Sequence, residues 1–256
     1  MVSARHGLED QVAIVTGAAG AIGSAVATEF AAMGAKVACL DVVAPGDVVE
    51  RINGAECRAI AVRADLTDEE AVTSAVAEVL EWGGRADVLV NMAGLYYGVP
   101  RVPFWEIDLG TWGAVVESNL RTAFLCARAV SAPMRSAGRG RIVNVSSNVS
   151  VFGMANFMHY VSAKAALVGM TRSMARELGP FGVAVNAVAP GLVRTPRGVD
   201  ELTPAYWDSV VAGQCLRSPI EIADVVNAVA FLSCDQSRMI TGQALLVNGG
   251  ASMGPF

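Results

Sequence analysis

The sequence lacks the residues and patterns that define several protein classes. It has two histidines and five cysteines, and no two cysteines are separated by two residues. We therefore expect neither a metal cluster of the zinc type nor a disulfide framework, and the odd number of cysteines is typical of a reducing compartment. The chain also has no run of Lys or Arg, and its formal net charge is −5. This balance disfavours nucleic acid and anionic membranes as partners.

Long apolar runs are also absent. No stretch reaches the roughly 18 consecutive apolar residues that a membrane span needs, and residues 1–10 contain no signal-peptide core. These absences predict a cytoplasmic protein with no membrane partner. The chain does have 53% hydrophobic residues over a length of 256. This is enough for one large buried core, so we expect a single domain over residues 1–256.

Short apolar segments alternate with longer segments of helical spacing. The short segments are rich in Val, Ile, Leu and Ala with little polar alternation, which is typical of strands buried on both faces of a parallel sheet. They cover residues 12–16, 36–41, 59–64, 87–91, 141–146, 182–189 and 244–247. The helix-like segments cover residues 21–33, 67–82, 109–137, 158–179 and 220–233. This order predicts an α/β fold, a doubly wound parallel sheet of the Rossmann type flanked by helices, with one long irregular stretch at 190–203.

Three glycines lie between the first predicted strand and the first predicted helix. Gly17, Gly20 and Gly23 leave room for backbone N–H groups to approach a pyrophosphate, and the helix N-terminus favours its negative charge. A tight turn can use glycine for its shape alone. The position inside a βαβ unit is therefore what makes this turn a predicted dinucleotide site.

An acidic residue ends the second predicted strand. Asp41 follows Gly23 by 18 residues, close to the spacing at which a carboxylate accepts both ribose hydroxyls of an adenosine. A carboxylate there repels the 2′-phosphate of NADP, and no Lys or Arg lies in the glycine turn to offset it. The sequence therefore predicts NAD as the cofactor, with NADP disfavoured.

A tyrosine and a lysine lie four residues apart in a predicted helix. Tyr160 and Lys164 therefore project from the same helix face. A tyrosine with its ordinary pKa near ~10 is a poor base at neutral pH, but a nearby ammonium and an oxidised nicotinamide both favour the phenolate. Ser147 follows the fifth strand at the sheet edge where ligands bind, so its hydroxyl is placed to bond a substrate oxygen. The Tyr–Lys pair alone is common on solvated helix faces and is not specific.

Taken together, these motifs make the chain resemble the compact, single-domain branch of the short-chain dehydrogenase/reductase family. The resemblance covers roughly residues 8–251. It is carried by motifs in the right order and at the right spacing, namely 16–23, Asp41, Asp65, 91–94, Asn119, 142–147, 160–164, 185–191, 240–243 and 247–250. Several ordered motifs are far more specific than any one of them.

The resemblance implies a catalytic role for four residues. Tyr160 corresponds to the general acid/base, and Ser147 to the residue that orients the substrate. Lys164 corresponds to the residue that binds the nicotinamide ribose and lowers the tyrosine pKa. Asn119 corresponds to the residue that holds a water in a proton relay behind that lysine.

The resemblance also implies the cofactor contacts and a homotetramer. Asp65 and Leu66 are expected beside the adenine, residues 91–94 along the cleft, and residues 190–195 at the nicotinamide end. The full set of expected cofactor-binding residues is Gly17, Gly20, Ala21, Ile22, Gly23, Asp41, Asp65, Leu66, Asn91, Ala93, Gly94, Tyr160, Lys164, Pro190, Gly191, Val193 and Thr195.

The chain departs from the family pattern at two places. The middle glycine of the turn is shifted to Gly20, and Ala21 stands in its usual place. The resulting spacing is that of the larger, epimerase-like branch, but this chain has no room for the substrate domain of that branch. Met92 replaces the second Asn of the usual Asn-Asn-Ala-Gly, which removes a hydrogen-bonding group but no catalytic one.

The substrate side is expected to be apolar and partly aromatic. Residues near 190–216 are expected to form a loop and short helix over the pocket. The predicted substrate contacts are Ser147, Tyr96, Val149, Phe157 and Trp207, although aromatics in such positions also pack in cores or between subunits. Arg194 and Arg197 suit either an anionic group or a solvated loop.

Three functions are compatible with these residues. The first is an NAD-dependent oxidoreductase that interconverts a secondary alcohol and a ketone, acting on a small, apolar molecule. The second is a 3-oxoacyl-thioester reductase. Asp41 disfavours this function because such enzymes usually use NADPH, and the sequence shows no basic cluster that would bind a carrier protein. The third is a non-catalytic nucleotide-binding sensor, which the intact catalytic set disfavours.

Overall fold

The computed structural model describes residues 7–54 and 58–254. Its main sheet is parallel throughout, with the strand order β3-β2-β1-β4-β5-β6-β9. The strands are β1 (Val12–Thr16), β2 (Lys36–Asp41), β3 (Ala59–Arg63), β4 (Val88–Asn91), β5 (Gly140–Val145), β6 (Val183–Pro190) and β9 (Ala244–Val247). The doubly wound fold predicted from the sequence is confirmed. From the centre of the sheet, β2 and β3 follow β1 toward one side, and β5, β6 and β9 follow β4 toward the other.

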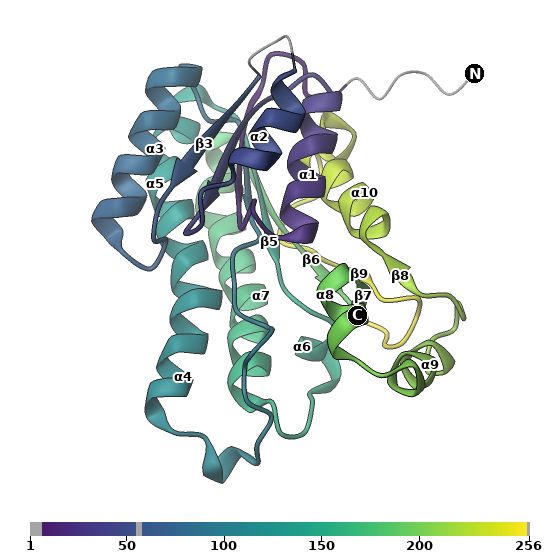
Figure 1. Cartoon of the computed structure of the whole chain (residues 1–256). Helices are drawn as coiled ribbons and strands as arrows, with labels where there is room; N and C mark the ends of the chain where they lie inside the picture. The colour runs from purple at the N-terminus through teal and green to yellow at the C-terminus, as the bar shows by residue number, and fades with distance from the viewer. Residues whose placement is uncertain (1–6, 55–57, 255–256) are drawn as a thin grey trace, which may run out of the picture.

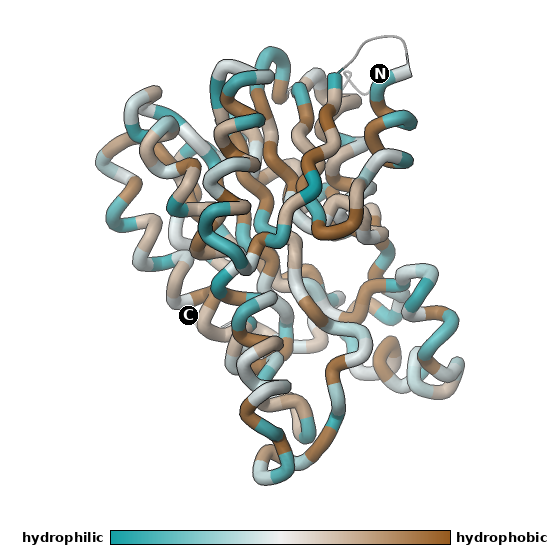
Figure 2. The backbone as a smooth tube through the Cα atoms, turned by 60° about the vertical axis from the view of Figure 1, so that its left-hand side comes forward, coloured by the Kyte–Doolittle hydropathy of each residue, from teal (hydrophilic) through white to brown (hydrophobic). Residues whose placement is uncertain are grey.

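Helices cover both faces of the sheet (Figure 1). One face carries α1 (Ala21–Ala32), α2 (Gly46–Asn53) and α10 (Ile222–Ser233), and the other carries α3 (Glu69–Gly83), α5 (Thr122–Ala137) and α7 (Met158–Leu178). Side chains of β1 alternate between the two layers, with Ala13 and Val15 on the α1 side and Val12 and Ile14 on the α3 side. Because both layers are apolar, β1 is buried along its whole length, and hydrophobic (brown) segments run through the middle of the molecule (Figure 2).

The structure differs from the sequence-based prediction in several elements. Helix α2 was not predicted, and the predicted helix at 109–137 is divided into α4 (Leu109–Val116) and α5 by a π-helical turn, Glu117–Arg121. The prediction of an irregular stretch at 190–203 is wrong, because it contains β7 (Val193–Arg194) and α8 (Pro196–Glu201).

Two threonines explain the helices that follow β6. Thr195 accepts a hydrogen bond from Gly198 N and begins α8, and Thr203 accepts one from Tyr206 N and begins α9 (Pro204–Ala212). Each threonine is followed by a proline at the first helical position, where a missing N–H costs nothing. These helices and α6 (Val149–Phe152) lie together at the end of the sheet where β5 and β6 finish (Figure 1).

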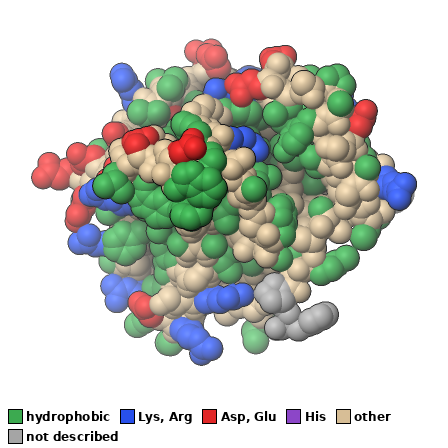
Figure 3. Space-filling model, turned by 90° about the horizontal axis from the view of Figure 1, so that it is seen from below, with side chains coloured by type: hydrophobic (Ala, Val, Ile, Leu, Met, Phe, Trp, Pro, Cys, Tyr) green, Lys and Arg blue, Asp and Glu red, His purple; other side chains and the backbone are tan. Residues whose placement is uncertain are grey.

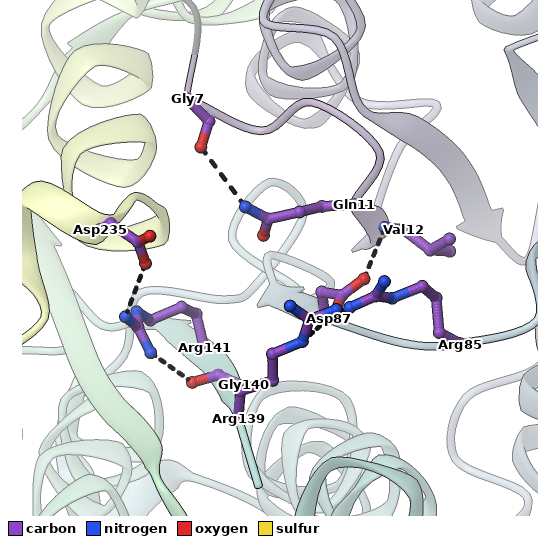
Figure 4. A network of polar contacts seen from close by, with 9 residues as sticks. All are labelled: Gly7, Gln11, Val12, Arg85, Asp87, Arg139, Gly140, Arg141 and Asp235. Atoms are coloured by element: carbon purple, nitrogen blue, oxygen red, sulfur yellow. Dashed lines mark hydrogen bonds and ion pairs between the residues drawn. The ribbon is translucent and has the colours of Figure 1, made fainter. Parts of the chain in front are cut away.

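At the opposite end of the sheet, where the strands begin, a polar network joins several chain segments (Figure 4). Asp87 precedes β4, is 5% exposed, and accepts a hydrogen bond from Val12 N at 2.9 Å. Arg85 donates to the same carboxylate, and Arg139 Nε lies 3.5 Å from it. The carboxylate therefore joins the start of β1 to the chain segments that lead into β4 and β5.

Two further sequence-based predictions concern the cysteines and membrane spans. Cys39 and Cys126 are buried and unpaired, as expected from their apolar neighbours, whereas Cys57 lies outside the described residues. Within the described part of the chain, no helix combines the length and apolar character needed to cross a membrane.

Candidate active site

A cavity of about 430 Å³ opens at the carboxyl ends of β4, β5 and β6. This is the sheet edge at which ligands bind in doubly wound folds. Twelve of the residues predicted from the sequence line it: Ile22, Gly94, Tyr96, Asn119, Ser147, Val149, Tyr160, Lys164, Pro190, Gly191, Val193 and Thr195. The structure thus brings together residues that are up to about 170 positions apart in the chain, taking Ile22 and Thr195 as the extremes.

Helix α7 presents Tyr160 and Lys164 to this cavity. The two side chains are 7% and 5% exposed, and Lys164 Nζ lies 5.6 Å from the centre of the Tyr160 ring. Lys164 Nζ donates a hydrogen bond to Val145 O at 2.9 Å, which ties the ammonium to the end of β5. This anchors the lysine beside the phenol.

The two serines at the end of β5 have different roles. Ser146 is buried and its Oγ donates to Lys164 O at 2.7 Å, so it fastens β5 to α7. Ser147 is partly exposed, and its side chain lines the cavity and interacts with Tyr160. Of the two, only Ser147 is available to a substrate.

Burial controls the protonation of the tyrosine and the lysine. Burial raises the pKa of Tyr160 well above its ordinary value, the neighbouring Tyr96 phenol raises it further, and Ser147 and Arg101 oppose the rise. Burial lowers the pKa of Lys164 to about 8. The protein's own groups therefore do not produce the lowered tyrosine pKa expected from the sequence, because desolvation of the phenolate outweighs the charges nearby.

Asn119 lies in the π-helical turn between α4 and α5. Its Nδ2 donates to Val115 O and to Leu95 O, both at 3.0 Å, while its buried Oδ1 has no hydrogen-bond partner within the described chain. A Cβ placed on Gly94 would lie 2.3 Å from that oxygen and 3.5 Å from Lys164 Nζ. The glycine therefore keeps open a polar space between Asn119 and Lys164, and a buried oxygen without a partner normally has a water or ligand beside it.

The glycine turn has the geometry that a dinucleotide requires. Gly17 adopts a left-handed φ of +68°, and a Cβ on Gly23 would lie 2.1 Å from Gly17 O, so the turn closes tightly against the start of α1. Helix α1 begins without a side-chain cap and without an acidic residue in its first turn. Its first N–H groups are thus available to an anion, which fits the pyrophosphate expected there.

Asp41 lies beside this turn at the end of β2. Its Oδ2 accepts a hydrogen bond from Ala19 N at 3.0 Å, and its Oδ1 accepts one from Val43 N at 3.1 Å. The carboxylate is thereby fixed next to the glycines, as the ribose-binding prediction requires. Arg63 lies opposite Asp41 in the register of β2 and β3, and its Nε donates a hydrogen bond to Val42 O at 3.1 Å, so a cation lies near this carboxylate although none lies in the glycine turn.

Several predicted cofactor residues have structural roles outside the cavity. Asn91 is buried, and its Nδ2 donates to Ala123 O and Asn144 Oδ1, so its amide joins β4 to its neighbours. Ala93 N donates to Thr16 Oγ1, and Leu66 belongs to the core beneath the sheet. Asp65 remains at the surface, where its hydrogen bonds with Thr67 lower its pKa.

Two of the predicted substrate residues do not line the cavity. Phe157 is 1% exposed and stacks behind Tyr160 with ring centres 4.8 Å apart, so it supports the tyrosine rather than facing the cavity. Trp207 points toward Gly198 and Thr195, and its neighbours on α9 line the cavity instead. Phe157 was expected in the pocket because it follows a motif that borders the active site, and a position in the sequence does not reveal which side of the ring is covered.

The cavity also has lining residues that the sequence analysis did not predict as substrate contacts. They are apolar and come from the segments after β4, β5 and β6: Leu95, Met154, Leu192 and Val210. Their scattered positions carry no motif, so no sequence signal identified them as a set.

Comparison with known proteins agrees with this geometry. A family model described as Enoyl-(Acyl carrier protein) reductase matches residues 17–252. The chain is 39% identical over 246 residues to the Cis-4-hydroxycyclohexanecarboxylate dehydrogenase of Sinomonas cyclohexanicum, covering 94% of this chain and 96% of that protein. The chain belongs to the short-chain dehydrogenase/reductase family.

Other members of the family are similar over nearly the whole of this short-chain dehydrogenase/reductase. The 3-oxoacyl-[acyl-carrier-protein] reductase of Staphylococcus aureus is 34% identical, covering 94% of this chain and 98% of that protein. A crystal structure of a putative short-chain alcohol dehydrogenase from Sinorhizobium meliloti has a TM-score of 0.90 and 31% identity, covering 97% and 98% of the two chains. The protein is therefore an oxidoreductase of a family that uses nicotinamide cofactors.

Proposed function

We propose that this short-chain dehydrogenase/reductase interconverts a small secondary alcohol and its ketone with NAD(H). The observation that carries the proposal is the buried Tyr160–Lys164 pair beside Ser147, at one end of a largely apolar cavity. The family fixes the reaction type as oxidation or reduction, and these residues supply the proton transfer that accompanies it.

The residues for the cofactor follow from the geometry of the turn and of β2. The N–H groups at Gly20–Gly23 would hold the pyrophosphate, and Asp41 would accept the hydroxyls of the adenosine ribose. Gly191, Val193 and the 91–94 segment would enclose the nicotinamide end. The bound cofactor supplies the acceptor or donor of a hydride at the substrate carbon.

Tyr160 acts as the general acid/base. In alcohol oxidation its phenolate oxygen takes the hydroxyl proton, and in ketone reduction its phenol returns that proton to the carbonyl oxygen. Ser147 holds the same substrate oxygen by a hydrogen bond, which fixes the reacting carbon beside the nicotinamide site. Lys164 places a positive charge next to the forming phenolate, and Asn119 holds the polar space behind it through which a proton reaches solvent.

The shape of the cavity favours a compact apolar substrate. Tyr96, Val149, Met154 and Val210 surround the space next to Ser147, and most of the lining is hydrocarbon or aromatic. The Sinomonas relative is named for a ring-bearing secondary alcohol, which suits such a space. We therefore propose an alicyclic or aryl secondary alcohol as the substrate class.

A 3-oxoacyl thioester is the second candidate substrate. It is favoured by the similarity to the Staphylococcus aureus reductase and by Arg63, which lies opposite Asp41 on β3, since a cation close to the adenosine ribose would suit NADPH. Asp41 acts against it, because the carboxylate itself lies beside the glycine turn.

We also propose that the chain forms a homotetramer. Hydrophobic side chains gather at the end of the molecule where α4 begins (Figure 3), and Phe104, Trp105 and Leu109 there are 59%, 72% and 87% exposed. Clustered exposure of large apolar residues indicates a surface that is covered by a partner.

The substrate and the cofactor are tested together by following nicotinamide absorbance with purified protein. The panel contains cyclohexanol, 1-phenylethanol, their ketones and a 3-oxoacyl thioester, each with NAD(H) and with NADP(H). We expect turnover of the cyclic or aryl alcohols with NAD. Turnover of the thioester with NADPH alone would contradict both the substrate and the cofactor proposal.

A further inference from the structure

An arginine lies against two residues that form the wall of the substrate cavity. Arg101 is exposed, and its Nη2 donates a hydrogen bond to Tyr96 Oη at 3.1 Å, while its Nη1 lies 3.4 Å from Met154 Sδ. Tyr96 and Met154 both line the cavity. The guanidinium is therefore held against two residues that form the wall of the proposed substrate site.

Aromatic rings fix the position of this guanidinium. Its carbon lies 4.6 Å from the centre of the Phe157 ring and 5.8 Å from that of Tyr96. Both rings also contact Tyr160, with ring centres 4.8 Å and 5.4 Å from it. The charge is thus separated from the acid/base by a single aromatic layer, and it opposes the rise that burial causes in the pKa of both Tyr96 and Tyr160.

Arg101 differs from Arg194 and Arg197, the two arginines whose positions in the sequence suit an anionic group. Arg197 Nε donates to Glu201 Oε1 at 2.6 Å, and Arg194 lies 3.9 Å from Glu221, so each has a carboxylate partner. Within residues 7–54 and 58–254, the contacts of Arg101 are a phenol, a thioether and two ring faces, with no carboxylate among them. Its positive charge is exposed to solvent and lies against Tyr96 and Met154, two residues of the cavity wall.

We propose that Arg101 and the Tyr96 hydroxyl bind a carboxylate at the end of the substrate remote from its reacting carbon. The guanidinium has N–H donors beyond the one used by Tyr96, and Tyr96 accepts that bond and keeps its own O–H to donate. The proposal rests on the proposed function and narrows its substrate to a hydroxy acid or keto acid. Ser147 and Tyr160 hold the reacting oxygen, and Arg101 fixes the opposite end of the molecule.

The test measures binding separately from turnover. Isothermal titration calorimetry of the full chain with saturating NADH compares cyclohexanecarboxylate with cyclohexanecarboxamide, neither of which carries an alcohol or ketone to react. We expect the wild type to favour the carboxylate and Arg101→Gln to weaken its binding roughly tenfold, with the carboxamide unchanged. Arg101→Lys should retain part of the preference for the carboxylate over the carboxamide. Added salt should weaken carboxylate binding only in the wild type and in Arg101→Lys, which keep a positive charge at position 101.

Arg197→Gln is the matched control. It removes the same charge from an arginine that lies 4.5 Å over the Tyr97 ring but is paired with Glu201, so carboxylate binding should not change. Equal weakening of both ligands by Arg101→Gln would overturn the proposal, because it would mean that the arginine only supports Tyr96. A wild type that binds the carboxamide as tightly as the carboxylate would overturn it as well.

Turnover distinguishes this proposal from the proposed function. The catalytic efficiency for 4-oxocyclohexanecarboxylate over its methyl ester should fall roughly tenfold in Arg101→Gln through a higher KM, with the ester unaffected. Carboxylate-selective binding without hydride transfer to any ketone of the panel would contradict the proposed function and support the anion site. Turnover of both ketones with no preference for the acid in the wild type would support the proposed function and contradict the anion site.

Discussion

Tyr160 is surrounded by groups that disfavour its charged form. It is buried against Phe157 and Tyr96, and burial is the largest cause of its raised pKa. The phenol is therefore protonated at neutral pH and ready to act as an acid, whereas alcohol oxidation needs the phenolate. Only a positive charge brought close to the ring, such as an oxidised nicotinamide, acts strongly in the other direction.

This electrostatic setting predicts opposite pH responses for the two reaction directions. The kcat/KM for alcohol oxidation should rise with pH above roughly 7, since the phenolate fraction grows as the pH approaches the raised pKa, and should rise less steeply above about 8, where Lys164 loses the positive charge that favours the phenolate. The kcat/KM for ketone reduction should not rise over the same interval, because the phenol is already protonated. Initial rates in both directions across this range are the measurement, and an oxidation rate independent of pH would contradict the assignment.

Asp41 determines the cofactor in this account. Asp41→Asn removes the negative charge next to the glycine turn, so the ratio of kcat/KM for NADP to that for NAD should rise about tenfold or more. Steady-state kinetics with both cofactors measures this ratio. An unchanged ratio would show that the carboxylate does not face the adenosine ribose.

Arg63 provides the control for the cofactor prediction. If it is the cation that meets the 2′-phosphate, then Arg63→Gln added to Asp41→Asn should abolish most of the gain with NADP. The same substitution in the wild type should leave the NAD kinetics almost unchanged. A gain that persists in the double variant would assign the phosphate to other groups.

At the scale of elements, the carboxyl ends and the amino ends of the parallel strands have separate roles. The carboxyl ends of the strands carry the proposed catalytic residues, and the amino ends are joined by Asp87 through Val12, Arg85 and Arg139 (Figure 4). Substitutions at the amino ends of the strands should therefore lower the free energy of unfolding without changing the kcat/KM of the folded protein.

Asp87→Ala tests this separation. The substitution leaves the buried Val12 amide without its acceptor, so the free energy of unfolding should fall by about 2 kcal/mol. Urea denaturation measures the loss, while kcat/KM of the folded protein should stay within about twofold. Asp235→Ala is the control, because Asp235 is 90% exposed and its ion pair with Arg141 should contribute about 0.5 kcal/mol or less.

The sequence predicted the elements whose signal is periodic and local. All seven strands of the main sheet and the long helices follow from apolar runs and helical spacing. Helix α2 was not predicted because it is short and polar, and Val48 is the buried residue along it. Helix α8 had a visible start signal at Thr195-Pro196, which the prediction of an irregular stretch at 190–203 overlooked, whereas α9 lies within residues 190–216, where a short helix was expected.

For the site, motifs predicted the residues that bear the chemistry but not the ones that shape the space. Tyr160, Lys164, Ser147 and Asn119 sit in ordered motifs, and the structure places all four around one cavity. Arg101 lies in no motif, and its position depends on how the segment after β4 folds back over Phe157. Such long-range placement is not encoded in local spacing.

For the whole molecule, the exposed apolar surface at the start of α4 predicts self-association. Multi-angle light scattering should give the mass of a tetramer, and Trp105→Glu with Leu109→Glu should lower it, because two charges would have to be buried at the contact. Met239→Glu is the control, since Met239 is 80% exposed but lies outside this surface. An unchanged mass in the double variant would place the subunit contact elsewhere.

The central claim is that Tyr160 transfers the proton in a nicotinamide-dependent oxidation or reduction. Its most direct test compares wild-type protein with Tyr160→Phe, measuring NADH binding by fluorescence and turnover by absorbance in the same preparations. The account predicts that the variant binds NADH within about threefold of the wild type and loses at least about a hundredfold in kcat, as expected for removal of a general acid/base. Turnover that survives in Tyr160→Phe would contradict the claim and assign the proton transfer to another group.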